Sequence, residues 1–233
     1  MVAAIFWDMD GTMVDSEPLW SIATYEMSER LGRRLSPEER ARTVGGCFAN
    51  TLEICARYAG YELKDEDYAI QHDLLFDRMR ELFRDELSPQ PGIRELLADL
   101  RSHGIPLFVT TNTERELADS SIAAVGTHFF DGSVTGDEVP RPKPAPDMYR
   151  RAAELAGAEP GECLVFEDST SGMRAAVEAG CRVIGVPSEP GQDMPEGVVS
   201  LRDLRLSDGC PEEQAGTFVG VSASDVQRWW EHL

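Results

Sequence analysis

Residues 2–18 read VAAIFWDMDGTMVDSEP. The six residues before Asp8 are apolar, which predicts a strand that is buried on both faces. The strand ends on two carboxylates, Asp8 and Asp10, which repel each other at short range and are costly to bury alone. Unless the stretch is only an acidic turn, positive groups from distant segments are therefore expected beside it.

Size and charge limit the possible functions of the protein. The chain has 233 residues, of which 42% are hydrophobic, and this is enough for a full core. Its formal charge of −20 repels nucleic acids and anionic lipid surfaces, so neither is expected as a partner. An anionic substrate would need local positive charge, because salt screens the wider field beyond about 8 Å. No apolar run is long enough to span a bilayer.

Cysteine usage predicts a reducing compartment. The five cysteines form no CxxC pair and match no zinc-ligand spacing, so we expect free thiols in a cytoplasmic protein. No basic region precedes the first apolar run, and we therefore expect no signal peptide. The oligomeric state stays open at this stage, with a monomer favoured.

The order of apolar patterns predicts an α/β fold in two parts. Residues 15–86 show helical spacing only, whereas strands at 105–111, 163–167 and 182–186 alternate with helices. This alternation is typical of a Rossmann-like parallel sheet with helices on both faces. We therefore expect an α/β core, a small all-helical cap domain inserted after the first strand, and a tail that could dock as a helix. The expected ranges are 1–14 and 87–205 for the core, 15–86 for the cap and 206–233 for the tail.

Open parallel sheets place their functional sites at the carboxyl ends of the strands. A lysine in the proline-rich loop RPKPAP is expected at the same edge, and it is one of only two lysines among 22 basic residues. The polar residues that this topology gathers there are Asp8, Thr111, Asn112, Lys143, Glu167 and Asp168.

Acids, a hydroxyl and a lysine at one edge suit a magnesium-assisted phosphoryl transfer. Mg²⁺ prefers a few carboxylates together with carbonyl, water and phosphate oxygens. Asp8 could attack phosphorus and form an aspartyl-phosphate, while Asp10 protonates the leaving oxygen and then activates water. Thr111 and Lys143 would hold the transferring oxygens.

Four segments in this order, DMDGT, VTTN, RPKPAPDMY and FEDSTSG, closely resemble the motifs of the haloacid dehalogenase-like hydrolases. The resemblance covers about residues 1–190. It is nearest to the subfamily with a helical cap between the first two motifs, which includes β-phosphoglucomutase and many sugar-phosphate phosphatases.

The resemblance implies a role for each motif residue. Asp8 is then the nucleophile and Asp10 the acid/base, with Thr111 and Lys143 as the other catalytic residues. The implied Mg²⁺ site uses Asp8, the carbonyl of Asp10, Glu167 and Asp168. The implied phosphate-binding residues are Met9, Gly11, Thr111, Asn112 and Lys143.

Two departures favour a phosphatase over a mutase within that subfamily. Mutases carry a cap-side histidine shortly after the first motif, and Trp20 stands at that position here. Their cap loop is also basic, whereas TVGGCFANTL at 43–52 has no basic residue. We therefore expect a Mg²⁺-dependent phosphatase for a small phosphorylated metabolite such as a sugar phosphate. The residues expected to face this substrate from the cap are Trp20, Gly45, Gly46, Cys47 and Phe48.

A phosphate-accepting receiver or a non-catalytic binding protein is the alternative from another class. Receivers also combine clustered acids, a hydroxyl and a lysine on a parallel sheet. Their acceptor aspartate, however, follows a middle strand of the chain, and they lack a long helical insert. The filled catalytic positions favour an enzyme.

Overall fold

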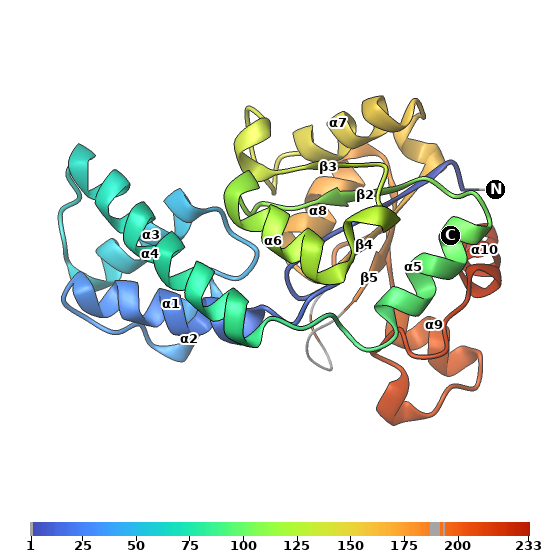
Figure 1. Cartoon of the computed structure of the whole chain (residues 1–233), viewed down its shortest axis with the longest axis horizontal. Helices are drawn as coiled ribbons and strands as arrows, with labels where there is room; N and C mark the ends of the chain where they lie inside the picture. The colour runs from blue at the N-terminus through green and yellow to red at the C-terminus, as the bar shows by residue number, and fades with distance from the viewer. Residues whose placement is uncertain (1, 187–191, 193) are drawn as a thin grey trace.

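The computed structural model describes residues 2–186, 192 and 194–233. Figure 1 shows an α/β part and, beside it, a separate bundle of helices formed by residues that follow the first strand. The predicted α/β class, with a parallel sheet covered on both faces, is confirmed. Residue 1 and residues 187–191 and 193, which belong to the predicted core range, lie outside the described residues.

The sheet of the described chain has six parallel strands in the order β3-β2-β1-β4-β5-β6. The four residues of β1 are all buried, as expected for a central strand that is covered on both faces. Since β2 and β4 flank β1, the carboxyl ends of these three strands meet at one edge. The strands are β1 (Ala4–Trp7), β2 (Leu107–Thr110), β3 (Gly132–Val134), β4 (Cys163–Glu167), β5 (Arg182–Gly185) and β6 (Val198–Ser200).

Helices cover both faces of the sheet. Side chains of α5, α6, α9 and α10 contribute to the core on one face, and those of α7 and α8 to the core on the other. In order these are α5 (Ile93–Ser102), α6 (Arg115–Val125), α7 (Asp147–Ala156), α8 (Thr170–Ala179), α9 (Leu201–Ser207) and α10 (Ala223–His232). Short 3-10 turns lie at Thr127–Phe129, Gly136–Glu138, Pro160–Glu162 and Glu212–Gln214.

The helical bundle has a hydrophobic core of its own. Its members are α1 (Glu17–Arg30), α2 (Pro37–Ala41), α3 (Phe48–Ala59) and α4 (Asp65–Glu86). Apolar side chains of α1, α3 and α4 pack together, and Leu117 of α6 joins this cluster from the α/β part. The bundle therefore rests on α6 at one side of the sheet (Figure 1). Within the described residues, no helix combines the length and hydropathy that a membrane span requires.

Two segments of the chain connect the bundle to the sheet, and hydrogen bonds join these segments to each other. Asp15 donates its backbone N–H to the carbonyl of Ser88 at 2.9 Å, and Gln90 donates to Met13 at 2.8 Å. The Gln90 side chain also donates to the carbonyl of Gly11 at 3.2 Å. The bundle is thus held at the edge that carries Asp8.

Sequence patterns missed two of the six strands. β3 and β6 have three residues each, which is too short for an alternating pattern to be recognised. Both lie at the edges of the sheet, where neighbouring strands supply the pairing that the local sequence does not specify.

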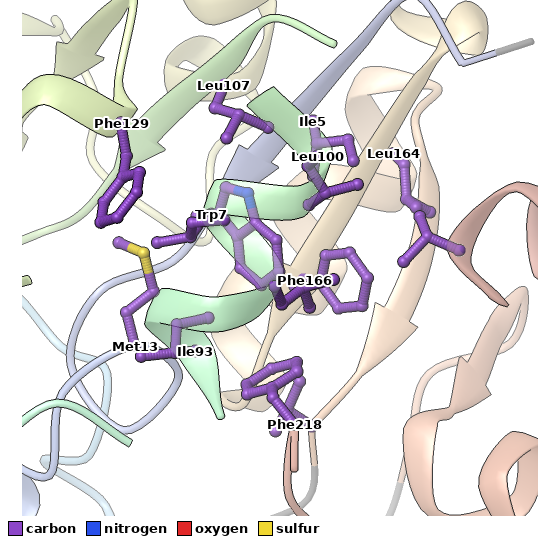
Figure 2. Packing of buried hydrophobic residues seen from close by; sticks show 14 of the residues in the cluster. Ile5, Trp7, Met13, Ile93, Leu100, Leu107, Phe129, Leu164, Phe166 and Phe218 are labelled. Atoms are coloured by element: carbon purple, nitrogen blue, oxygen red, sulfur yellow. The ribbon is translucent and has the colours of Figure 1, made fainter. Parts of the chain in front are cut away.

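The tail packs into the main core through Phe218 as well as through side chains of α10. Phe218, which is buried, meets Trp7 edge-to-face at 5.6 Å and Phe166 at 5.9 Å between ring centroids. Trp7 and Phe166 stack at 4.3 Å, and Figure 2 shows the three rings together. Gly92 allows this approach, because a Cβ there would lie 2.4 Å from the backbone of Val219.

We expect Phe218→Ala to lower the free energy of unfolding by about 3–5 kcal/mol, because it empties a close-packed aromatic site under β1 and β4. Urea denaturation of both proteins measures this difference. Val219→Ala is the matched control, since Val219 is the next residue and is 38% exposed. A similar small loss for both variants would contradict the core role of Phe218.

Candidate active site

The carboxyl ends of β1, β2 and β4 bring the predicted residues to one edge. Asp8 follows β1 directly, Thr111 follows β2, and β4 ends on Glu167, with Asp168 next in the chain. Lys143 reaches the same place from the loop before α7. Among the described residues, Asp8, Glu167 and Asp168 form a buried cluster whose carboxylate oxygens lie within 4.8 Å of one another.

Lys143 lies at the centre of this cluster. Its ammonium donates to Asp8 Oδ1 at 2.6 Å, to Glu167 Oε2 at 2.7 Å and to the carbonyl of Thr110 at 3.0 Å. These three acceptors satisfy all three N–H groups of the ammonium. Lys143 is 4% exposed, so each interaction acts in a medium of low dielectric constant.

Glu167 holds this lysine rather than opening toward the cavity. Its Oε2 also accepts from the Tyr149 hydroxyl at 2.7 Å, and its Oε1 accepts from the Ser169 amide and hydroxyl at 3.0 and 2.7 Å. A Cβ on Gly172 would lie 2.0 Å from Glu167, so a glycine is needed there. These bonds favour a positioning role for Glu167 over the ligand role that the sequence predicts.

Asp8 and Asp168 fit a divalent cation. Asp8 Oδ2 is buried and accepts no hydrogen bond from any residue that the structure describes. The three clustered carboxylates face a single ammonium, so when ionised they leave two negative charges uncompensated. Gly11 leaves room beside Asp168, because a Cβ there would lie 2.2 Å from Asp168 Oδ2. Hard oxygen ligands of this kind suit Mg²⁺.

Burial shifts the protonation equilibria of the cluster. Burial, and then the charge of Glu167, raise the pKa of Asp8 to about 8, although Lys143 opposes the shift. Burial and the charge of Asp8 likewise raise the pKa of Asp168 well above its usual range. Burial would lower the pKa of Lys143, but Asp8 and Glu167 outweigh it and raise this pKa instead. The lysine therefore stays charged, and a bound cation would displace protons from the two aspartates.

The carboxylate of Asp10 accepts hydrogen bonds from four side chains. Its Oδ1 accepts from the Ser16 hydroxyl at 2.7 Å and from the Trp20 indole N–H at 2.9 Å. Its Oδ2 accepts from the Thr113 hydroxyl at 2.7 Å and from the Thr111 hydroxyl at 3.3 Å. Two of these donors belong to the start of the helical bundle and two to the loop after β2. The orientation of this carboxylate therefore depends on both parts of the chain.

Some of the predicted phosphate-binding residues already use their hydrogen-bonding groups within the protein. Gly11 has φ +88° and donates its N–H to the carbonyl of Val14 at 2.9 Å, so that amide is occupied. Asn112 uses its amide to fix two loops: it donates to the carbonyls of Gly45 and Lys143 and accepts from the amide of Lys143. The Met9 side chain belongs to the main core.

A cavity lies between the sheet edge and the helical bundle, and it is lined from both sides. Asp8, Asp10, Thr111, Lys143 and Asp168 line it from the α/β part. Four of the five residues that the sequence predicted to face a substrate from the bundle also line it: Trp20, Gly45, Gly46 and Phe48. The fifth, Cys47, is the N-cap residue of α3 and is not among the described lining residues.

Sequence reasoning missed several polar residues of this cavity. Glu17, Arg40 and Thr43 line it from the bundle, and Thr113 binds Asp10. Arg40 lies in the short helix α2, in the arginine-rich segment PEERAR, where its pattern is that of a solvated surface residue. Only its 5% exposure in the folded chain distinguishes it. Thr113, two residues after Thr111, could have been found from the repeated threonines of VTTNT.

Comparison with known proteins gives a family match over most of the chain. The model of the haloacid dehalogenase-like hydrolases matches residues 5–186. The phosphorylated carbohydrates phosphatase of Thermotoga maritima is 32% identical over 185 residues, which cover 78% of this chain and 84% of that protein.

A longer relative and a solved structure extend the comparison. The bifunctional riboflavin kinase/FMN phosphatase of Arabidopsis thaliana is 28% identical over 88% of this chain, but the match spans only 55% of that protein. The crystal structure of CbbY from Rhodobacter sphaeroides in complex with phosphate superposes with a TM-score of 0.79 at 27% identity. This superposition covers 97% of this chain and all of the other.

We expect Mg²⁺ to stabilise the protein more at pH 8 than at about pH 5.5. Because folding raises the pKa of Asp8 from 3.8 to about 8, the metal-free protein loses stability as pH rises through that window. The cation replaces the protons that are lost and removes the repulsion between the carboxylates. Thermal melting with and without MgCl₂ at both pH values measures the effect, and a larger gain at the lower pH would contradict this account.

Proposed function

The chain belongs to the haloacid dehalogenase-like hydrolase family, and we propose that it is a Mg²⁺-dependent phosphatase for a small phosphomonoester such as a sugar phosphate. The observation that carries this proposal is the position of Asp8. It is buried between Lys143 and Asp168, with one carboxylate oxygen unbonded among the described groups and Asp10 lining the same cavity. The name of the Thermotoga maritima relative supports a phosphorylated carbohydrate as substrate.

In the first step, a carboxylate oxygen of Asp8 attacks phosphorus. The bond between phosphorus and the ester oxygen breaks, and Asp10 gives its proton to that oxygen, so a neutral alcohol leaves. Lys143 keeps the attacking carboxylate oriented and offsets the charge on the phosphoryl oxygens.

In the second step, water attacks the phosphorus of the aspartyl-phosphate. Asp10 takes a proton from this water, the bond between phosphorus and Asp8 breaks, and phosphate leaves with Asp8 regenerated. Ser16, Trp20, Thr111 and Thr113 hold Asp10 on the side where both proton transfers occur.

When Mg²⁺ is bound by Asp8, the carbonyl of Asp10 and Asp168, it supplies positive charge that neutralises the carboxylates and the phosphate. We propose residues 15–86 as a cap domain on a core of residues 1–14 and 87–205. The cap would exclude water from the aspartyl-phosphate until the alcohol has left. Contacts of Asn112 and Ser171 with the carbonyl of Gly45 support a closed arrangement of the two parts.

We propose a cytoplasmic protein that acts without nucleic acid or membrane partners. All five cysteines are free thiols, as suits a reducing compartment, and the charge of −20 disfavours anionic polymers.

A β-phosphoglucomutase-like mutase is the second candidate, because the fold and motifs of that subfamily are shared. Trp20 in place of the mutase histidine favours hydrolysis. Its indole N–H binds Asp10 as a donor only and cannot exchange a proton with it. Assays of β-glucose 1-phosphate for isomerisation as well as phosphate release distinguish the two reactions.

We expect Asp8→Asn to abolish both turnover and covalent labelling by substrate. The amide cannot form the acyl phosphate, so the loss should exceed about 10³-fold. Phosphate release and mass spectrometry of acid-quenched protein measure the two effects. Asp119→Asn is the control, because the Asp119 side chain is 65% exposed on α6. Retained hydrolysis in Asp8→Asn would remove Asp8 as the nucleophile.

Asp10→Asn should slow hydrolysis by about 10²–10⁴-fold, the usual contribution of a general acid and base. Its Mg²⁺ affinity should stay close to that of the unmodified protein, since only the backbone carbonyl of Asp10 is proposed as a ligand. Steady-state kinetics and calorimetric titration with Mg²⁺ test the two statements separately. Loss of metal binding with normal folding would show that the side chain is a ligand.

A further inference from the structure

The cap side of the cavity carries an ion pair that the proposed catalytic steps do not use. Arg40 donates to Glu17 Oε1 at 2.5 Å and to the Thr43 hydroxyl at 2.9 Å. The Thr43 hydroxyl in turn donates to the carbonyl of Arg40 at 2.7 Å, which fixes the start of the loop after α2. All three residues line the cavity that holds Asp8 and Asp10.

Glu17 is the more exposed member of this pair. Its side chain is 32% exposed, whereas that of Arg40 is 7% exposed. The guanidinium has a fixed charge that Glu17 compensates, and its Nε is buried without a partner among the described residues. Both side chains line the cavity that holds Asp8, so the pair offers it a guanidinium whose charge is already compensated by a carboxylate.

The charge of the whole cavity is unfavourable for a second anion. Five acidic residues line it and two basic ones, and one of the two bases, Lys143, also faces the carboxylate of Glu167 behind it. These groups therefore keep a net negative charge when a divalent cation is bound and Asp10 carries its proton. Lys143 is fully used by Asp8, Glu167 and Thr110. The acids are Asp8, Asp10, Glu17, Glu114 and Asp168, and the bases are Arg40 and Lys143.

The remaining lining of the cap side suits a neutral polyol. The hydroxyls of Thr24 and Thr51 can donate or accept hydrogen bonds, and the hydroxyl of Thr43, whose proton goes to the carbonyl of Arg40, can accept a further one. The carboxylate of Glu17 accepts hydrogen bonds from substrate hydroxyls. Phe48 and Phe76 add apolar faces against which the C–H groups of a sugar can pack.

We propose that the Glu17–Arg40 pair determines specificity by charge, and that it selects phosphate esters of uncharged sugars or alditols against esters with a second anionic group. This inference rests on the proposed phosphatase function and narrows its substrate class. The pair binds the leaving group and repels a second phosphate or a carboxylate, while the phosphoryl end of the cavity is common to all substrates.

Two substrate pairs test the selection, because the members of each differ in one group. Fructose 1-phosphate is compared with fructose 1,6-bisphosphate, and 2-hydroxyethyl phosphate with phosphoglycolate. We expect kcat/KM for the neutral member to exceed that for the anionic member by at least about tenfold in both pairs. A ratio near one, or a preference for the anionic member, overturns the proposal.

The two substitutions in the pair should affect this ratio differently. Glu17→Gln leaves the cation of Arg40 uncompensated, so the ratio should fall about tenfold or invert. Arg40→Gln leaves the carboxylate unpaired, so the ratio should stay high or rise. Glu26→Gln is the matched control, because Glu26 lies on the same helix and pairs with Arg78 away from the cavity.

The outcomes separate this inference from the function on which it rests. Thermal melting shows whether each variant folds. If one variant does not fold, the ratio of kcat/KM for the neutral and anionic substrates of the unmodified protein still tests the proposal. If the protein hydrolyses p-nitrophenyl phosphate but shows equal kcat/KM for both members of each pair, charge selection is wrong. The proposed phosphatase function is then still supported. No hydrolysis of any phosphomonoester with Mg²⁺ present would overturn both.

Discussion

The buried ammonium of Lys143 between the carboxylates of Asp8 and Glu167 is the interaction on which the site depends. A lone carboxylate at the end of a central strand would be costly to bury, and three would repel one another. The lysine compensates part of this charge and at the same time fixes the rotamers of Asp8 and Glu167. The negative charge that remains favours the binding of a divalent cation.

The second constraint is that both parts of the molecule hold Asp10, the proposed acid/base. Asp10 accepts hydrogen bonds from Ser16 and Trp20 at the start of the helical bundle and from Thr111 and Thr113 after β2. Closure of the bundle over the sheet edge and orientation of this carboxylate are therefore coupled. A substrate that holds the two parts together would complete the site as it binds.

The outer parts of the fold support this edge from behind. The aromatic stack of Trp7 and Phe166 lies under the strands that end on Asp8 and Glu167, and Phe218 of the tail closes it. The hydrogen-bonded connecting segments at Asp15 and Gln90 hold the bundle beside the same strands. Packing far from the cavity thus keeps the carboxylates within the distances that the chemistry requires.

The fold class and the polar residues that gather at the sheet edge could be predicted from local sequence patterns. The buried run before Asp8, the alternation of strands and helices, and the ordered motifs identify residues whose convergence follows from parallel topology. The use of each residue became visible only in the folded chain: Glu167 and Asn112 hold their neighbours, the amide of Gly11 is occupied, and Arg40 is buried against Glu17. Local patterns cannot specify these roles, because burial and hydrogen-bond partners come from segments that meet only in the folded chain. The three-residue strands β3 and β6 escaped prediction for the same reason.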